Sequence, residues 1–183
     1  MRISFDLDNT IFDLSVLYQM ACDANGCKYT PPADYDIYKS YDMPIADELT
    51  KLFSSPHLYE TPVISSVIPD AINKLIANPE HDVHFVTERY ICDVAMDHTQ
   101  LCNAGILCNI ANVHDCTPKI DALLQLKPDI HFDDSPRVVS DCIRNGINVV
   151  MISNPETLYN AHLRGLVEHH TNLVDALRAH NLI

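Results

Sequence analysis

The sequence predicts a three-layer α/β fold, in which helices cover both faces of a parallel sheet. From residue 69 onward, short apolar runs of strand type alternate with helical segments, and this alternation is typical of parallel α/β sheets. Gly105 and Gly146 each separate a helical segment from an isoleucine that opens the next strand, as glycines that end helices do. Acidic residues follow the first and fourth predicted strands, where such sheets carry their sites.

The first strand is predicted at Ile3, Phe5 and Leu7, and two acids, Asp6 and Asp8, lie where it must end. Side chains two positions apart on an extended chain point to the same side, so the two carboxylates share one small space. Like charges this close raise each other's pKa unless a cation joins them. Mg²⁺ suits oxygen ligands best. Taken alone, the pair is also compatible with two solvated acids in a turn.

Residues 14–65 are predicted to form a small helical insertion after the first strand. A helix is expected over 14–24, and a short helical period recurs near residues 45–53. The segment 28–62 is rich in proline and tyrosine and contains no buried strand pattern. Its tyrosines either line a substrate pocket or pack the insertion: Tyr29, Tyr35, Tyr38, Tyr41 and Tyr59.

The remaining elements follow in regular order. They are a helix from Pro69, a strand at 82–87, a helix at 90–104, a short strand within 106–113, a helix at 119–126, a strand at 130–134, a helix at 136–145, a strand at 147–152 and a last helix capped by Thr171. Because the carboxyl ends of parallel strands meet at one edge, we expect five side chains there: Asp6, Asp8, Thr87, Asp133 and Asp134.

Four carboxylates at one sheet edge repel one another unless positive charge joins them. Mg²⁺ and a lysine would supply that charge. Lys119 opens the helix after the third strand and reaches this edge, whereas Lys127 lies in the loop entering the fourth strand, at the opposite end. The hydroxyl of Thr87 and the amide of Glu88 lie at the end of the second strand. Together these groups predict a cradle for a phosphoryl group.

Three further residues have two readings each. Arg89 either contacts substrate or is a solvated loop residue, and His84 and His131, inside predicted strands, are read as packed histidines rather than ligands.

These residues, in this order, resemble the motifs of the haloacid dehalogenase-like phosphatase superfamily. The matching pieces span nearly the whole chain: F-D-L-D-N-T at 5–10, Thr87, Lys119 and F-D-D-S-P at 132–136. The resemblance implies a Rossmann-like α/β/α core formed by residues 1–13 and 66–183. It also implies a helical cap at 14–65, inserted after the first strand.

The resemblance implies the central chemistry as well. Asp6 would attack phosphorus and become an aspartyl-phosphate, and would also bind Mg²⁺. Asp8 would protonate the leaving alcohol and later deprotonate water, while its main-chain carbonyl binds the metal. The dehalogenases of the superfamily lack an acid at the position of Asp8, so the resemblance favours a phosphatase.

Other matched residues would hold the phosphate and the metal. Thr87, Glu88 and Lys119 would bind the phosphoryl oxygens. Asp133 would bind Mg²⁺ directly, and Asp134 would hold a metal-bound water or Lys119.

A narrower resemblance is to the 5'(3')-deoxyribonucleotidases and their bacterial and phage relatives. It rests on the position of the cap, on L-F-S-S-P-H-L-Y at 52–59, on the run 133–136 and on the turn Asn154-Pro155-Glu156. The spacing from Lys119 to Asp133 is longer than in that group. We therefore expect a Mg²⁺-dependent 5'-nucleotidase, with a sugar phosphate or amino-acid phosphate, or a polynucleotide 3'-phosphate, as the alternative substrates.

Composition narrows the function classes. The net charge of −13 argues against a duplex nucleic-acid partner. No apolar run approaches the roughly 20 residues of a membrane span, and no signal-peptide pattern is present. Seven cysteines without a C-x-x-C pair indicate reduced thiols and a cytoplasmic protein.

The sequence is also compared with two other protein classes, and it does not define the oligomeric state. A phospho-receiver domain is excluded by the order of the motifs, because its phosphorylated aspartate precedes the threonine and lysine on a middle strand. An inactive member of the same fold, used as a binding module, is the remaining alternative.

Overall fold

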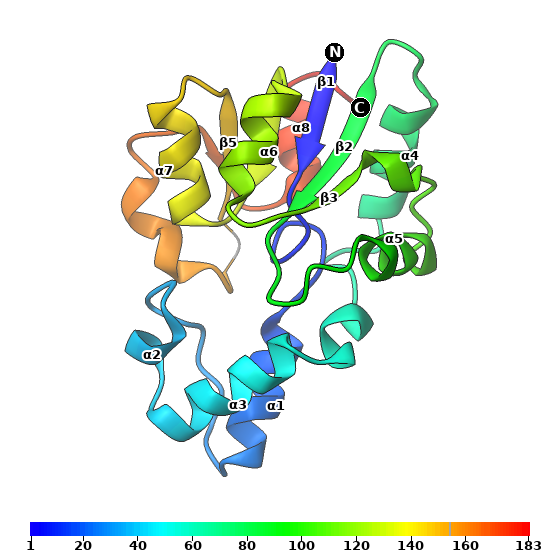
Figure 1. Cartoon of the computed structure of the whole chain (residues 1–183). Helices are drawn as coiled ribbons and strands as arrows, with labels where there is room; N and C mark the ends of the chain where they lie inside the picture. The colour runs from blue at the N-terminus through cyan, green and yellow to red at the C-terminus, as the bar shows by residue number, and fades with distance from the viewer. Residues whose placement is uncertain (154) are drawn as a thin grey trace.

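A computed structural model of the chain describes residues 1–153 and 155–183. These residues form a six-stranded parallel sheet in the order β3-β2-β1-β4-β5-β6, with helices on both faces (Figure 1). The predicted α/β fold class is confirmed. The predicted turn at 154–156 begins outside the described residues. The strands are β1 Arg2–Phe5, β2 Asp82–Thr87, β3 Val113–Asp115, β4 Ile130–Asp133, β5 Val149–Ile152 and β6 His169–His170.

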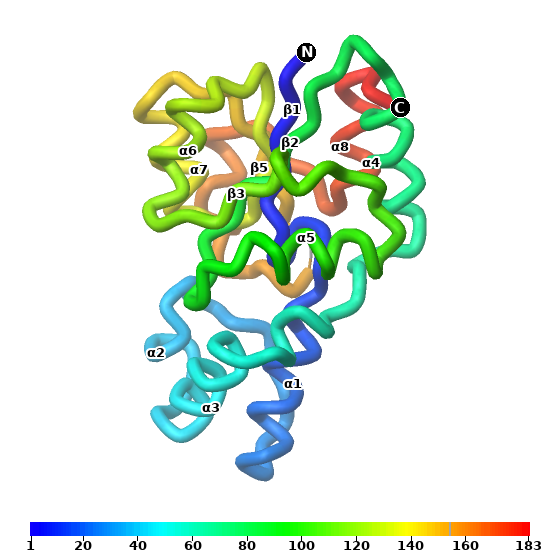
Figure 2. The backbone as a smooth tube through the Cα atoms, turned by 45° about the vertical axis from the view of Figure 1, so that its right-hand side comes forward, coloured from blue at the N-terminus to red at the C-terminus, as the bar shows by residue number. Residues whose placement is uncertain are grey.

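Two hydrophobic clusters lie on opposite faces of the sheet. Side chains alternate between the faces of a strand, and β5 sends Val150 and Ile152 into one cluster and Val149 and Met151 into the other. Figures 1 and 2 show α4 and α8 on one face and α6 and α7 on the other. The helices are α1 Ser15–Ala24, α2 Ile37–Ser40, α3 Met43–Phe53, α4 Ile68–Ala77, α5 Val94–Asn103, α6 Lys119–Leu126, α7 Pro136–Arg144 and α8 Leu173–Ala179. None of these helices is long and apolar enough to cross a membrane.

β1 lies in the middle of the sheet, between β2 and β4, and its side chains from Ile3 to Phe5 are buried. Ile3 and Phe5 are fully buried, and the ring of Phe5 stacks on Phe132 with a centroid distance of 5.2 Å. Ser4, between them, is also fully buried and hydrogen-bonds His131 Nδ1 at 2.9 Å. The first strand therefore delivers Asp6 to the centre of the carboxyl edge, with its surroundings fixed by packing.

Residues 14–65, called here the cap segment, lie beyond the carboxyl ends of the strands (Figure 2). α1, α2, α3 and the 3₁₀ helix η1 Pro56–Glu60 enclose a hydrophobic cluster that is separate from those on the sheet. Leu17 and Leu49 are at its centre, with exposures of 1% and 0%. The separate cluster is compatible with the predicted division into core and cap, which stays a prediction.

The cap segment is joined to the sheet by two crossings that hydrogen-bond each other. Asp13 N donates to Pro62 O at 2.8 Å, Ile64 N donates to Ile11 O at 2.9 Å, and Phe12 forms an antiparallel bridge with Val63. Both crossings therefore meet immediately after Asp6 and Asp8.

Several elements differ from the sequence prediction. The helix predicted at 90–104 runs from Val94 to Asn103, and the strand predicted at 147–152 begins at Val149. The third strand begins at Val113, because residues 106–112 form a loop and the 3₁₀ helix η2 Ile110–Asn112, with Leu107 and Ile110 exposed. The last helix is capped by Asn172, whose Oδ1 accepts from Asp175 N at 2.9 Å, and not by Thr171. The two-residue strand β6 was not predicted, because its histidines show no apolar pattern.

Candidate active site

The carboxyl ends of three neighbouring strands bring the predicted residues together. β1 lies between β2 and β4, so Asp6, Thr87 and Asp133 emerge side by side. All three are buried, with exposures of 4%, 1% and 0%. Asp6 N donates to Phe132 O at 2.9 Å and extends the pairing of β1 with β4 to the site itself.

Lys119, the first residue of α6, joins two of these carboxylates. Its Nζ donates to Asp6 Oδ1 and, at 2.8 Å, to Asp133 Oδ2. Burial raises the pKa of Asp6 to about 7, against the opposing charge of Lys119. Burial disfavours the ammonium too, but the Asp133 and Asp6 carboxylates raise the pKa of Lys119 above its ordinary value. The lysine therefore stays charged between the two acids.

Asp133 is surrounded by donors from the protein. Its Oδ1 accepts from Ser135 N at 2.8 Å, and its Oδ2 contacts Lys119 and, at 3.0 Å, His131 Nε2. Burial opposes ionisation, but Lys119 and His131 outweigh it and lower the pKa of Asp133 to about 2. His131 is fully buried, in keeping with its reading as a packed histidine, and it also orients this carboxylate.

Asp134 has a different environment. The hydroxyl of Tyr159 donates to Asp134 Oδ2, and Asn9 Nδ2 donates to the same hydroxyl at 3.0 Å. Burial raises the pKa of Asp134, and the charges of Asp6 and Asp133 raise it further. A buried acid beside two others is a site that attracts a cation.

Asp6, Asp133 and Asp134 form a group of carboxylates that can hold a metal ion. Each offers one oxygen, and the three oxygens lie within 4.8 Å of one another. All-oxygen donors of this kind fit Mg²⁺. The predicted set of direct ligands left out Asp134, which the structure places in the group.

Thr87, the last residue of β2, and Glu88, which follows it, both line the cavity described below. Glu88 pairs through its carboxylate with Arg137 of α7 and accepts from Lys119 N at 3.2 Å. Its side chain thereby links the start of α6 to α7, while the prediction concerned its amide.

The carboxylate of Asp8 is held by Arg89. Arg89 Nη2 donates to Asp8 Oδ1 at 2.6 Å and Nε donates to Oδ2 at 3.1 Å. The reading of Arg89 as a solvated loop residue is wrong, because its side chain is 1% exposed and forms ion pairs inside the protein. Its contact with substrate stays a prediction.

A cavity of about 300 Å³ lies between the sheet edge and the cap segment. Its core side includes every predicted site residue except Asp133. Its cap side and rim carry five aromatic rings: Tyr18, Tyr35, Tyr38, Phe53 and Tyr90. Of the five cap-segment tyrosines that were predicted either to line a pocket or to pack the insertion, Tyr35 and Tyr38 line this cavity. The other three are not among its lining residues.

Solved structures share this architecture along the whole chain. A haloacid dehalogenase-like family hydrolase from Streptococcus pneumoniae matches with a TM-score of 0.63 and 16% identity, covering 98% of this chain and 97% of that chain. A predicted phosphatase from Clostridium acetobutylicum matches with a TM-score of 0.63 and 15% identity, covering 99% and 97%. The chain has the haloacid dehalogenase-like fold.

A third match with this fold contains ligands. The haloacid dehalogenase family hydrolase from Deinococcus radiodurans, with bound phosphate and sodium, has a TM-score of 0.61 and 16% identity, covering 98% of this chain and 94% of that chain. No protein-family model matches the sequence, and a search of curated proteins finds no match.

Several residues of the site escaped the sequence reading. In the haloacid dehalogenase-like fold of this chain, Tyr159 reaches Asp134 from η3 Leu158–Leu163, far along the sequence. Asp97 and Gln100 of α5 contact Arg89. The sequence could have indicated that Asp97 and Gln100 are buried, because both lie on the same face of the helix as the fully buried Leu101. Polar residues on a buried stripe indicate a polar partner inside the protein.

Proposed function

We propose that this chain is a phosphomonoesterase that works through an aspartyl-phosphate on Asp6. The observation that carries the proposal is the position of Asp6 on the wall of the cavity, with Lys119 in contact and Asp8 and Asp134 on the same wall. A nucleophile, a cation and a second acid thus face one space large enough for a small substrate.

The reaction has two displacements at phosphorus. A carboxylate oxygen of Asp6 forms a bond to phosphorus as the ester P–O bond breaks, and Asp8 gives its proton to the departing oxygen. Water then attacks the aspartyl-phosphate, Asp8 accepts a proton from it, and the bond from phosphorus to Asp6 breaks. The products are the alcohol and inorganic phosphate.

Charge on the phosphoryl oxygens is balanced by groups at the same sheet edge. The ammonium of Lys119, the hydroxyl of Thr87 and the amide of Glu88 would receive these oxygens. Fixed donors in a buried site stabilise charge that develops in the transition state more strongly than water does.

Mg²⁺ fits the acidic group at the end of the sheet. We assign Asp6 and Asp134 as its side-chain ligands, together with the main-chain carbonyl of Asp8. Asp133 keeps Lys119 in place instead, because its two oxygens already accept three protein donors and it does not line the cavity. When bound, the ion supplies positive charge that offsets the repulsion among the acids and polarises a phosphoryl oxygen.

The aromatic wall supports a nucleotide as the substrate. Phe53 of α3 and Tyr90 of the core stack with centroids 6.3 Å apart and an angle of 7° between the rings. Base faces stack on such rings without regard to sequence, at about 1–3 kcal/mol per base. A nucleoside 5'-monophosphate would place its base against this wall and its phosphate at Asp6. Sugar phosphates and phosphoserine carry no aromatic ring that could stack on this wall.

A substrate panel tests the proposal. Purified protein is assayed for phosphate release from deoxyribonucleoside and ribonucleoside 5'-monophosphates, sugar phosphates, phosphoserine and p-nitrophenyl phosphate, each with Mg²⁺ and with EDTA. We expect Mg²⁺-dependent hydrolysis, with nucleotides having the highest kcat/KM. Absence of hydrolysis of every ester would contradict the phosphatase assignment, and a preference for sugar phosphates would contradict the nucleotide alone.

A further inference from the structure

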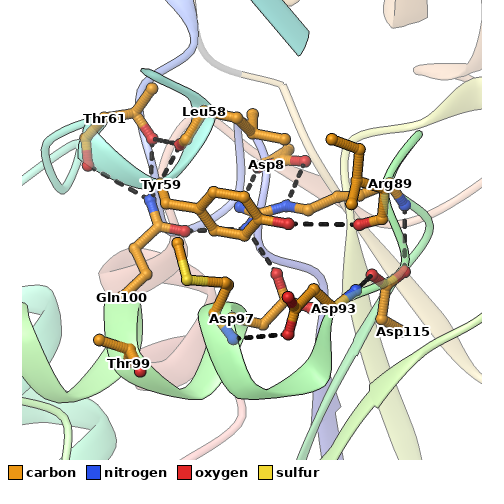
Figure 3. Close-up of polar contacts among 12 residues, drawn as sticks. Asp8, Leu58, Tyr59, Thr61, Arg89, Asp93, Asp97, Thr99, Gln100 and Asp115 are labelled. Atoms are coloured by element: carbon orange, nitrogen blue, oxygen red, sulfur yellow. Dashed lines mark hydrogen bonds and ion pairs between the residues drawn. The ribbon is translucent and has the colours of Figure 1, made fainter. Parts of the chain in front are cut away.

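A buried polar cluster surrounds Arg89 on the side of the site that faces α5 (Figure 3). The proposed reaction does not use it. Arg89, Asp97 and Gln100 have exposures of 4%, 0% and 3%, and burying so many polar groups is costly unless each is paired.

Arg89 contacts Asp8 in a two-pronged manner, with one nitrogen on each carboxylate oxygen, at 2.6 and 3.1 Å. Such a contact fixes the plane of the carboxylate as well as its position. A carboxylate has about four lone-pair sites, so the two remaining sites stay open for a proton. The guanidinium itself is not among the groups that line the cavity.

The third guanidinium nitrogen is held by α5. Arg89 Nη1 donates to Asp97 Oδ1 at 2.7 Å and to Gln100 Oε1 at 2.9 Å. Asp97 Oδ2 is buried and has no hydrogen-bond partner within the described residues. A buried ion pair is weak evidence for a contribution to stability. The contact of Asp97 with Arg89 fixes the guanidinium, which points to a role in positioning.

The same cluster reaches the segment through which the chain returns from the cap segment. Gln100 Nε2 donates to Thr61 Oγ1 at 3.0 Å and to Leu58 O at 3.3 Å. The ring of Tyr59 lies over the guanidinium, 5.2 Å from its carbon to the ring centroid. Arg89 is therefore clamped between α5 and the end of the cap segment, as Figure 3 shows.

We propose that Arg89, held by Asp97 and Gln100, is a positioning residue that orients the carboxyl group of Asp8 toward the leaving group. This inference rests on the proposed phosphatase function. It adds a dependence on α5, none of whose residues lines the cavity.

Leaving groups separate this role from a purely structural one. In the first displacement, an alkoxide needs the proton of Asp8, whereas p-nitrophenolate is stable without it. The kcat/KM value reports only steps up to the first irreversible one, which is phosphoryl transfer to Asp6. A misdirected Asp8 therefore lowers kcat/KM for an alkyl phosphate much more than for p-nitrophenyl phosphate.

Arg89→Lys is the main variant, because it keeps the charge and removes the two-pronged contact. Since general acids contribute about 10²- to 10⁴-fold, we expect a loss of about 30-fold or more with the best alkyl phosphate and less than about 5-fold with p-nitrophenyl phosphate. Gln100→Met, which keeps the length of the side chain, should shift the ratio in the same direction by less. Arg2→Lys, which weakens an arginine–aspartate pair at the other end of β1, should leave the ratio unchanged.

Equal losses on both substrates in Arg89→Lys and Gln100→Met, or no loss on either, would overturn the inference. Crystal structures of the wild-type protein and of Arg89→Lys decide the same question without activity. We expect the Asp8 carboxylate to turn away from its position in the wild-type protein, and an unchanged Asp8 overturns the positioning role. A wild-type protein that hydrolyses no ester would instead contradict the proposed function.

Discussion

Lys119 Nζ lies 2.8 Å from Asp133 Oδ2, with both side chains buried. The contact joins the first residue of α6 to the last residue of β4, across strand β1. It explains why acids can gather at this edge before any metal arrives. It also separates the two residues of the Asp133-Asp134 run, because only Asp134 lines the cavity.

Asp6→Asn should abolish turnover and leave the fold intact. The amide cannot form the aspartyl-phosphate, so we expect a loss of at least about 10³-fold with every substrate. Phosphate release and circular dichroism measure the two quantities. Asp42→Asn, at an exposed position of the cap segment whose side chain caps nothing, serves as the control and should retain full activity. Substantial activity of Asp6→Asn would mean that another residue is the nucleophile.

Lys119→Met should destabilise the protein as well as inactivate it. Removing the ammonium leaves Asp6 and Asp133 buried without their shared partner, and breaking such a pair costs about 3–5 kcal/mol. Urea unfolding measures the free energy of unfolding. Adding Asp133→Asn to Lys119→Met should recover part of this stability, because it removes one of the two buried carboxylates that have lost their lysine partner. If the double variant is less stable than the single one, the two residues do not act as a pair.

Mg²⁺ should raise the melting temperature of the wild-type protein, and EDTA should reverse the rise. A ligand that binds only the folded state adds about 2.7 kcal/mol at 100 times its Kd. Asp134→Asn should lose most of this increment. Asp133→Asn should lower stability even without metal and keep more of the increment. The opposite ranking would restore Asp133 as the direct ligand that the sequence predicted.

Asp97 should give the stability of the protein a recognisable pH dependence. Burial raises its pKa to about 7, against the opposing charge of Arg89. Between about pH 4, the unfolded value, and pH 7, the folded protein therefore keeps a proton that the unfolded chain has released. The stability due to this group is present below pH 4 and is lost as the pH rises through 7.

Urea unfolding at pH 5 and pH 8 tests this. The free energy of unfolding of the wild-type protein should fall between the two values by about 1–4 kcal/mol more than that of Asp97→Asn. Asp42→Asn should follow the wild-type protein. Parallel pH profiles for wild type and Asp97→Asn would show that Asp97 is ionised throughout.

Much of the fold could be predicted from sequence because its elements carry strong local patterns. β2 and α6 begin and end where expected, since an apolar run and a helical stripe mark them. β3 could not be placed, because only Val113 of its three residues is buried. Local sequence patterns say little about so short a strand.

The residues of the site likewise fall into those that the sequence predicts and those that it does not. The place of Asp6 and Lys119 at the site could be predicted, because the strand and helix patterns of the residues next to them in the sequence define where each one lies. The partner of Asp8 was not, since the clamp on Arg89 depends on α5 packing against the returning end of the cap segment. Tyr159 likewise reaches the site only through the order of the strands. Such contacts join segments that are far apart in the sequence, and local sequence patterns do not predict them.

The paired crossings of the cap segment have an evolutionary consequence. Because Asp13 and Pro62 are hydrogen-bonded neighbours, the residues between them form an insertion whose two ends lie side by side. Such a module can lengthen, shorten or be exchanged for another while the sheet keeps its register. New substrate preferences can thus arise while the chemical centre stays the same, and any replacement segment must still fit the contact of Gln100 in α5 with Thr61.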